Sequence, residues 1–223
     1  MLLFFAGLVV FSYPSIKGEQ LETAAADSIV QFVEAKQAER AQTNFSILYP
    51  ELFQEMQLYN QRIFEEKQST LKDNFSYAEP SFTLSDYGLE AETIAVLNIP
   101  ALELSMPVYL GANEENMAAG AAHMSNTSLP VGGTNTNCVI AGHRGYSGAD
   151  YFKHLDTLKE GDSVQLVTLW NTMNYTVSEI QIIEPYEVEQ ILIQEGRELL
   201  TLLTCHPYAS GGRYRYLVIC ERS

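Results

Sequence analysis

The feature that most constrains the fold is a series of short β-type segments in the C-terminal part of the chain. They are runs of β-branched, aromatic and other apolar residues separated by turn-forming residues, at 93–99, 106–110, 138–141, 163–168, 175–183, 199–204 and 214–219. Many short strands with frequent turns are typical of a β-barrel or a β-sandwich rather than of alternating β and α units. The sequence therefore predicts a mainly β domain over residues 91–223.

The preceding residues have a different pattern. Apolar residues recur at spacings of three and four from Glu19 to about Thr43 and again from Pro50 to about Gln68, which predicts two amphipathic helices. Joined by a short loop, they would form a helical hairpin within an extension at 17–68. Residues 69–90 keep no period and are interrupted by Asn, Pro, Ser and Gly. A loop of that length is usually functional or disordered.

The first residues form an apolar segment of their own. Residues 1–16 carry no charge, and the first charged residue is Lys17. The segment is shorter than the roughly 20 residues that span a bilayer, and it lacks the basic start of a signal peptide. We interpret 1–16 as a fragment of an N-terminal membrane anchor; a buried helix is the alternative.

Composition excludes several classes of function. Asp and Glu number 28 against 13 Lys and Arg, giving a net charge of −15. Such an excess disfavours binding to a nucleic acid backbone, which needs clustered cations. The three cysteines form no CxxC pair, the four histidines show no ligand spacing, and no phosphate-binding glycine motif occurs. We therefore expect neither a metal nor a nucleotide cofactor.

A nucleophilic-cysteine site is the chemistry that the strand ends favour. Such a site needs a thiol, a nearby imidazole and a group that stabilises an oxyanion. Cys205 and His143 each end a predicted strand, and Arg213 and Arg215 open the last strand. Each residue alone is a weak signal, because most cysteines and histidines are structural. Their combination at strand ends, where loops expose side chains, makes them candidates for catalysis.

Four motifs resemble those of sortases, the cysteine transpeptidases of Gram-positive cell surfaces. Thr-Leu-Leu-Thr-Cys at 201–205 resembles the TLxTC signature, and Ala-Gly-His-Arg-Gly at 141–145 resembles the catalytic-histidine motif. Residues 127–133 resemble the loop before the histidine strand, and 215–218 the arginine-bearing last strand. The order His, Cys, Arg also matches, and the resemblance covers roughly 91–222. It implies a closed sortase β-barrel with short helices.

The resemblance also implies a reaction. The Cys205 thiolate would attack the threonine carbonyl of an LPxTG-like sorting signal and cleave the Thr–Gly bond. An amine would then resolve the thioacyl-enzyme, with His143 as acid and then base and with Arg215 stabilising the oxyanion. The implied partners are pilins or surface proteins and an acceptor amine from a pilin lysine or peptidoglycan. The implied location is the outer face of the membrane of a Gram-positive bacterium, without any cofactor.

The N-terminal part resembles class C, pilus-building sortases in particular. The helices of 17–68 and the loop of 69–90 are similar to the extension and lid of that class. Its lids carry an Asp, a spacer and an aromatic residue, and Asp73 and Phe75 have that spacing. The resemblance implies that Asp73 pairs with the catalytic arginine and that the ring of Phe75 covers the cysteine. Asn74 stands where the family usually has proline.

Two of these assignments have alternatives in the sequence. Arg215 fits the family motif better than Arg213, but residues two apart on a strand face the same side, so alternation does not decide between them. Asp86 followed by Tyr87 is a second possible lid anchor without the spacer. The loop could also simply link the helices to the barrel.

The other histidines and acids are predicted to have structural or surface roles. His206 follows Cys205 directly, so it should point to the opposite face of the strand, and we expect it at the mouth of the groove rather than in catalysis. His123 and His154 have no motif support. Asp150 and Asp156 are expected to be solvated loop acids.

The remaining cysteines are expected to be structural. Cys138 and Cys220 lie in predicted strands and are expected to be small buried residues. A disulfide between them is the alternative.

Three other functions compete with the leading hypothesis. A housekeeping sortase would attach proteins to peptidoglycan and would not need the helical extension and lid. A cysteine protease would release the acyl group to water. A non-catalytic scaffold protein of the pilus would have no reason to keep Cys205, His143 and a suitable arginine together.

Overall fold

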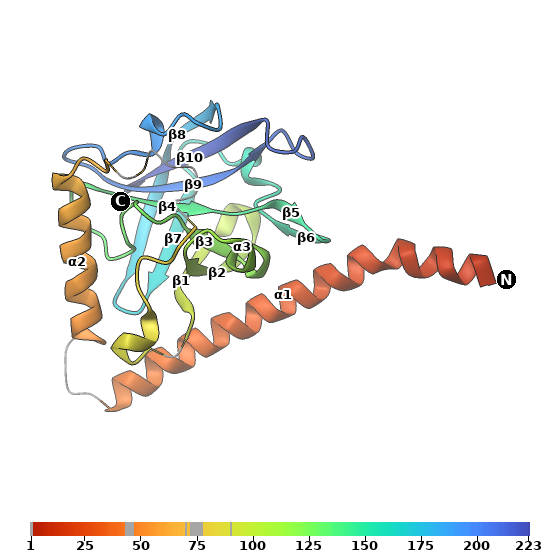
Figure 1. The fold of residues 1–223 in the computed structure, drawn as a ribbon, viewed down its shortest axis with the longest axis horizontal. Helices are drawn as coiled ribbons and strands as arrows, with labels where there is room; N and C mark the ends of the chain where they lie inside the picture. Colours follow the sequence, from red (N-terminus) through yellow and green to blue (C-terminus); the bar gives the residue numbers. More distant parts are fainter. Residues whose placement is uncertain (1, 43–46, 70, 72–77, 90) are drawn as a thin grey trace.

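The computed structural model describes residues 2–42, 47–69, 71, 78–89 and 91–223. Its central feature is a closed β-barrel with the strand order β1-β2-β3-β4-β9-β10-β8-β7 (Figure 1). The strands are β1 (Thr93–Ile99), β2 (Leu104–Leu110), β3 (Ala121–His123), β4 (Thr136–Ala141), β7 (Ser163–Thr168), β8 (Thr172–Ile183), β9 (Glu198–His206) and β10 (Tyr214–Arg222). The predicted mainly β fold is confirmed, and the structure decides for a barrel rather than a sandwich.

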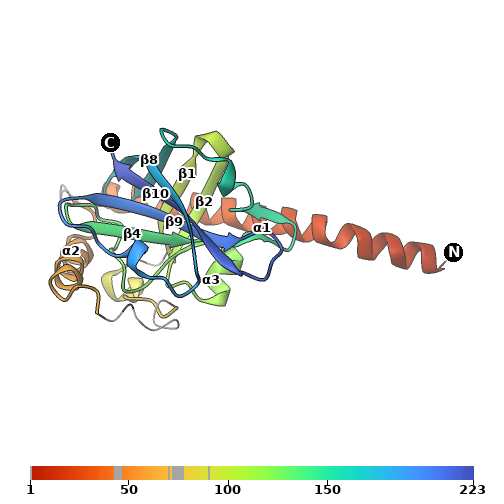
Figure 2. The same ribbon diagram turned by 90° about the horizontal axis from the view of Figure 1, so that it is seen from above.

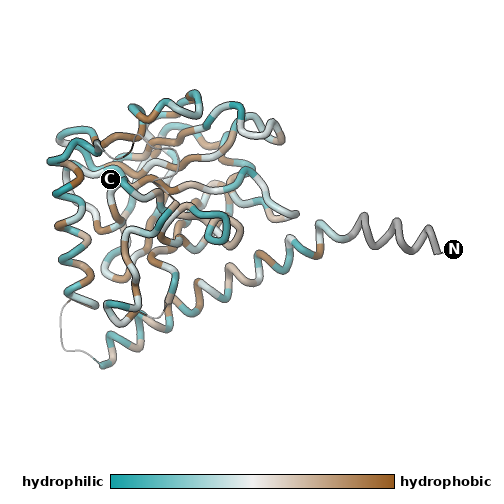
Figure 3. The backbone as a smooth tube through the Cα atoms, viewed as in Figure 1, coloured by the Kyte–Doolittle hydropathy of each residue, from teal (hydrophilic) through white to brown (hydrophobic). Residues whose placement is uncertain are grey.

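Because the sheet closes on itself, the barrel that the structure describes has no edge strand with unpaired backbone groups. β1 pairs with β2 on one side and with β7 on the other, both antiparallel, so every barrel strand has two neighbours. Side chains alternate across the strands, and Leu97, Leu166 and Val218 are fully buried inside. Figure 3 shows the apolar segments concentrated in the barrel.

Short elements connect the barrel strands. β5 (Arg144–Tyr146) and β6 (Ala149–Tyr151) form a separate two-stranded hairpin after β4. The helix α3 (Glu114–Ala119) lies between β2 and β3. Four 3-10 turns complete the described connections: η1 (Leu84–Tyr87), η2 (Pro100–Leu102), η3 (Leu155–Thr157) and η4 (Glu189–Ile191). The hairpin and α3 both lie near one end of β4.

The two N-terminal helices are present, but they diverge instead of lying side by side. α1 (Leu2–Gln42) is one long helix whose C-terminal part runs along the barrel and whose N-terminal part projects beyond it, whereas α2 (Pro50–Glu65) stands against another part of the barrel (Figures 1 and 2). α1 also starts at Leu2, so most of the segment at 1–16 continues into the helix of the extension. Among the described residues, none of the helices combines the length and the apolar character of a membrane span.

Each helix is held to the barrel by its own apolar face. Phe32 of α1 is fully buried, and Lys36 donates a hydrogen bond from Nζ to the carbonyl of Thr168 at 2.6 Å. Leu52 and Met56 of α2 are also fully buried. Because the apolar face of each helix meets the barrel, the helices do not need to pack against each other.

Candidate active site

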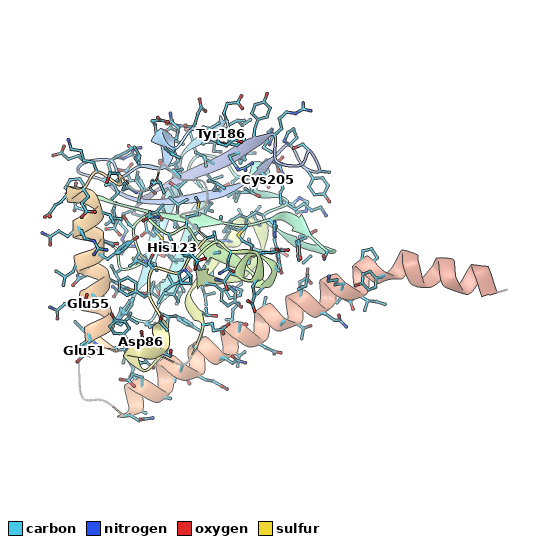
Figure 4. The ribbon with its side chains drawn as sticks, viewed as in Figure 1. Glu51, Glu55, Asp86, His123, Tyr186 and Cys205 are labelled. Atoms are coloured by element: carbon cyan, nitrogen blue, oxygen red, sulfur yellow. The ribbon has the colours of Figure 1, made fainter. Side chains whose placement is uncertain are left out.

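A cavity of about 620 Å³ opens beside the ends of β4, β9 and β10. Cys205, His143 and Arg215 all line it, although they come from three separate segments of the chain. The wall of the cavity is largely apolar, and Met117 of α3 is part of it. Tyr186 lines the cavity while remaining 75% exposed, and Figure 4 shows it on the same side of the barrel as Cys205.

Strand pairing explains why His143 and Cys205 meet. β4 and β9 are parallel, and Ala141 is the last ladder partner of Leu203. Two further hydrogen bonds extend the pairing: the amide of Gly142 donates to the carbonyl of Leu203 at 3.0 Å, and Oγ1 of Thr204 donates to the carbonyl of Gly142 at 2.7 Å. His143 and Cys205 come next on the two chains, so they lie side by side where the pairing between β4 and β9 ends.

The arginine that faces this cysteine is Arg215. It is the direct ladder partner of Cys205 on β10, and its Nη1 donates to the carbonyl of Gly212 at 2.7 Å. A β-carbon on Gly212 would lie 3.0 Å from Nη1 of Arg215 and 3.2 Å from Sγ of Cys205. The thiol and the guanidinium therefore flank the same glycine, whose φ of +78° also favours glycine. Arg213 is exposed, precedes β10 and does not line the cavity.

Cys205 is the accessible thiol of the three. It is partly exposed, whereas Cys138 and Cys220 are buried in the barrel, and all three are free. Burial raises the pKa of the Cys138 thiol, and it raises that of Cys220 to about 12. The two buried thiols are therefore poor nucleophiles at neutral pH, and the expectation that they are structural fits the geometry.

Two residues that the sequence patterns did not single out, Tyr146 and Glu114, act on the imidazole of His143. Its ring stacks on Tyr146, with centroids 4.7 Å apart and planes 10° apart, and Tyr146 in turn stacks near Tyr151. Desolvation lowers the pKa of His143, and the negative charge of Glu114 on α3 opposes that shift. Tyr146 follows the histidine within its hairpin, which is a possible signal; nothing in the sequence places Glu114 there.

The face of β9 turned away from the cavity differs from the prediction in two places. His206 points to that face, as strand alternation requires, and so it does not line the cavity mouth. Its Nδ1 lies 2.6 Å from Nη1 of Arg144. Asp156 is not simply a solvated acid, because it forms an ion pair with the buried Arg144. On that face His206 and Asp156 both contact the buried guanidinium of Arg144.

The other predicted acids and histidines stay outside the site. Asp150 pairs with Lys153 at 2.7 Å and lies 3.5 Å from His154 on the surface. His123 is fully buried in β3. Within the described residues, no group of His, Cys, Asp and Glu could hold a metal ion.

The predicted lid residues are Asp73 and Phe75, and Asp86 is the alternative anchor. Asp73 and Phe75 lie outside the described residues, so their role stays a prediction. The alternative anchor, Asp86, belongs to η1 and lies beside α2, far from Cys205 (Figure 4). Asp86 is therefore not an anchor at this cavity.

Comparison with known proteins identifies the family. Residues 97–223, more than half of the chain, match the sortase domain family. The chain is 25% identical over 129 residues to sortase D of Bacillus subtilis, covering 57% of this chain and 62% of that protein. It is 28% identical over 151 residues to sortase A of Streptococcus agalactiae, covering 63% and 60%. The chain spans about three fifths of the length of these curated relatives, and it belongs to the sortase family.

Solved structures extend the similarity to the N-terminal helices. Sortase C1 of GBS Pilus Island 1 superposes with a TM-score of 0.76 at 30% identity, covering 89% of this chain and 92% of that one. Sortase C of Streptococcus pneumoniae gives a TM-score of 0.62 at 33% identity, covering 78% and 94%. The predicted resemblance to class C sortases is confirmed.

Proposed function

We propose that this protein is a transpeptidase that cleaves an LPxTG-like sorting signal between Thr and Gly and transfers the threonyl group to a pilin lysine. The observation that carries the proposal is the convergence of Cys205, His143 and Arg215 on one cavity of a sortase barrel. The apolar wall of that cavity suits the side chains of an extended peptide, because burying them is favourable.

In the first half of the reaction, the Cys205 thiolate attacks the threonine carbonyl and forms a C–S bond. The guanidinium of Arg215, which stays charged at any working pH, stabilises the oxyanion that develops on the carbonyl oxygen. When the C–N bond breaks, the imidazolium of His143 gives its proton to the leaving glycine amine. The product is a thioester between threonine and Cys205.

In the second half, an amine attacks the thioester and forms an amide bond. The neutral His143 accepts the proton that the amine loses, and Cys205 leaves as a thiolate. The histidine is thereby protonated again, and the site returns to its starting state. The partly buried position of His143 lowers its pKa, which favours the neutral form needed in this half.

The choice of a pilin substrate is supported by the structural relatives. One is named for GBS Pilus Island 1, and the crystal structure of the Streptococcus pneumoniae enzyme is associated with pilin substrate specificity. A housekeeping role is the second candidate, because several curated relatives are named sortase A. The proposed location is the outer face of the membrane of a Gram-positive bacterium: the apolar segment at 1–16 supports attachment to a membrane, and the sortase family supports the cell surface.

The test is incubation of the protein with a purified pilin that carries a sorting signal, followed by mass spectrometry. We expect a Thr–Lys isopeptide bond and, on trapping, a thioacyl adduct on Cys205. The variant Cys205→Ala should form neither, whereas Cys138→Ala and Cys220→Ala should keep most activity. Release of the free threonine acid alone would indicate a protease. Transfer only to peptidoglycan amines would indicate a housekeeping sortase.

A further inference from the structure

Arg144 is a buried residue that the proposed reaction does not use. It follows His143 directly and opens β5, with only 8% of its surface exposed. Its guanidinium pairs with the carboxylate of Asp156, and Nη1 lies 2.6 Å from Nδ1 of His206. The same Nη1 lies 3.5 Å from the carbonyl oxygen of Cys205. The side chain of Arg144, next to His143, therefore contacts both the carbonyl of Cys205 and the ring of His206.

The chemistry of this contact fixes the state of His206. A guanidinium has only hydrogen-bond donors, so Nδ1 of His206 must be the acceptor and its proton must be on Nε2. The ring of His206 also lies 5.5 Å from that of Tyr216 on β10, and Arg144 lies over the same Tyr216 ring at 5.8 Å. The imidazole is therefore held in one orientation, by Arg144 and by Tyr216.

The contact completes a symmetrical arrangement around the catalytic pair. Before the pair, Thr204 donates to the carbonyl of Gly142 and links β9 to the end of β4. After the pair, Arg144 links β5 to His206. His143 lies between Gly142 and Arg144, and Cys205 lies between Thr204 and His206. Each catalytic residue therefore has one of the two cross-strand links on either side of it. Their backbone separation is thus constrained on each side.

Stability alone does not account for a buried arginine at this place. Desolvating a charge is costly, and well-packed apolar residues often serve stability as well or better. Within the described residues, Nε of Arg144 is also buried without a hydrogen-bond partner. A charged side chain buried at such a cost suggests a role other than packing.

We propose that Arg144 is a positioning residue that acts through His206 to set Cys205 opposite His143. The inference rests on the proposed function for the roles of those two residues. It does not require Arg144 to touch substrate, because its side chain lies on the face of β9 turned away from the cavity.

The test compares four variants by steady-state cleavage of a sorting-signal peptide. Arg144→Met and His206→Phe remove the link while keeping bulk, and we expect each to lower kcat tenfold or more with KM within twofold. His206→Asn places an amide oxygen where Nδ1 stands, so it should keep at least a third of wild-type kcat. The matched control, Arg197→Met, removes the Arg197–Glu221 ion pair at the far end of β9 and β10 and should change kcat less than twofold.

A double variant separates positioning from general damage. If Arg144 acts through His206, Arg144→Met with His206→Phe should be no more than threefold slower than the worse single variant, because both remove one interaction. Multiplication of the two losses would overturn the proposal. So would a loss of activity that appears only at temperatures where the variant unfolds. If Arg144→Met does not fold, the comparison of His206→Phe with His206→Asn decides.

A measurement without substrate keeps this test independent of the proposed function. Alkylation of Cys205 by iodoacetamide at neutral pH, read by mass spectrometry, reports the surroundings of the thiol directly. We expect its rate to change threefold or more in Arg144→Met and His206→Phe, and less than twofold in His206→Asn. Equal rates in all variants would overturn the positioning role. Absence of peptide transfer by the wild-type protein would instead overturn the proposed function.

Discussion

Cys205 and Arg215 are held by the same ladder, so either side chain can be changed without removing the backbone pairing that supports the other. Arg215→Ala should lower the cleavage rate by about a hundredfold or more, because a donor to the oxyanion acts on the transition state. Arg213→Ala should stay within about twofold of wild type, since Arg213 is outside the cavity. Initial rates with a fluorogenic peptide measure both. The reverse pattern would assign the role to Arg213.

The charge of Glu114 gives a second prediction at this scale. Its carboxylate raises the pKa of His143 against the larger lowering by desolvation. Glu114→Gln should therefore lower the pKa of His143 further and shift the alkaline limb of the pH–rate profile, where protonated His143 is lost, to lower pH. An NMR titration of the imidazole measures the change. An unchanged titration would show that Glu114 does not act on His143.

Among the elements, β3 carries a histidine that makes stability depend on pH. Burial lowers the pKa of His123 from 6.5 to about 4, and its Nε2 lies 3.0 Å from the carbonyl of Ser128. Between these values the unfolded chain binds more protons than the native protein, so stability falls as pH falls. The lowered pKa accounts for roughly 2 kcal/mol of the loss from pH 7 to pH 5.

The variant His123→Gln tests this account. Glutamine can keep a donor toward the Ser128 carbonyl but does not titrate in this range. The free energy of unfolding of the variant, measured by urea denaturation, should therefore fall less between pH 7 and pH 5 than that of the wild type. The comparison uses each protein's own change with pH, so a constant destabilisation by the substitution does not affect it. Equal falls would mean that His123 is not the titrating group.

For the whole molecule, the close contact between α1 and the β5–β6 hairpin is the most testable link. Gly18 of α1 is buried against the turn, and a β-carbon there would lie 2.5 Å from the carbonyl carbon of Gly148. Because β5 follows His143 directly, this contact connects the N-terminal helix to the element that carries the catalytic histidine.

Gly18→Ala should destabilise the protein by about 1–2 kcal/mol through overpacking. Helix propensity alone would predict the opposite, a gain of about 1 kcal/mol, so the sign is diagnostic. The melting temperature should fall and trypsin should cut faster after Lys17, whereas Glu19→Ala at an exposed position should change neither. A rise in the melting temperature of Gly18→Ala would show that α1 is not packed there.

Much of this protein was determined by its sequence alone. Strand period and turn residues predict the β domain, because alternation and glycine placement are local properties of the chain. Cys205 and His143 could be found because each lies at the end of a predicted strand within a recognisable motif. The spacing of apolar residues likewise predicts α2, including its start at Pro50.

Only the tertiary structure decided how these parts meet. Closure into a barrel depends on pairings between distant strands, and local pattern does not specify them. The divergence of α1 from α2 depends on which surface each apolar face covers. Alternation could not choose between Arg215 and Arg213, but the register of β10 against β9 places Arg215 opposite Cys205. Arg144 and His206 meet for the same reason: charge and hydrogen bonding select partners by distance in space, and the sequence records only distance along the chain.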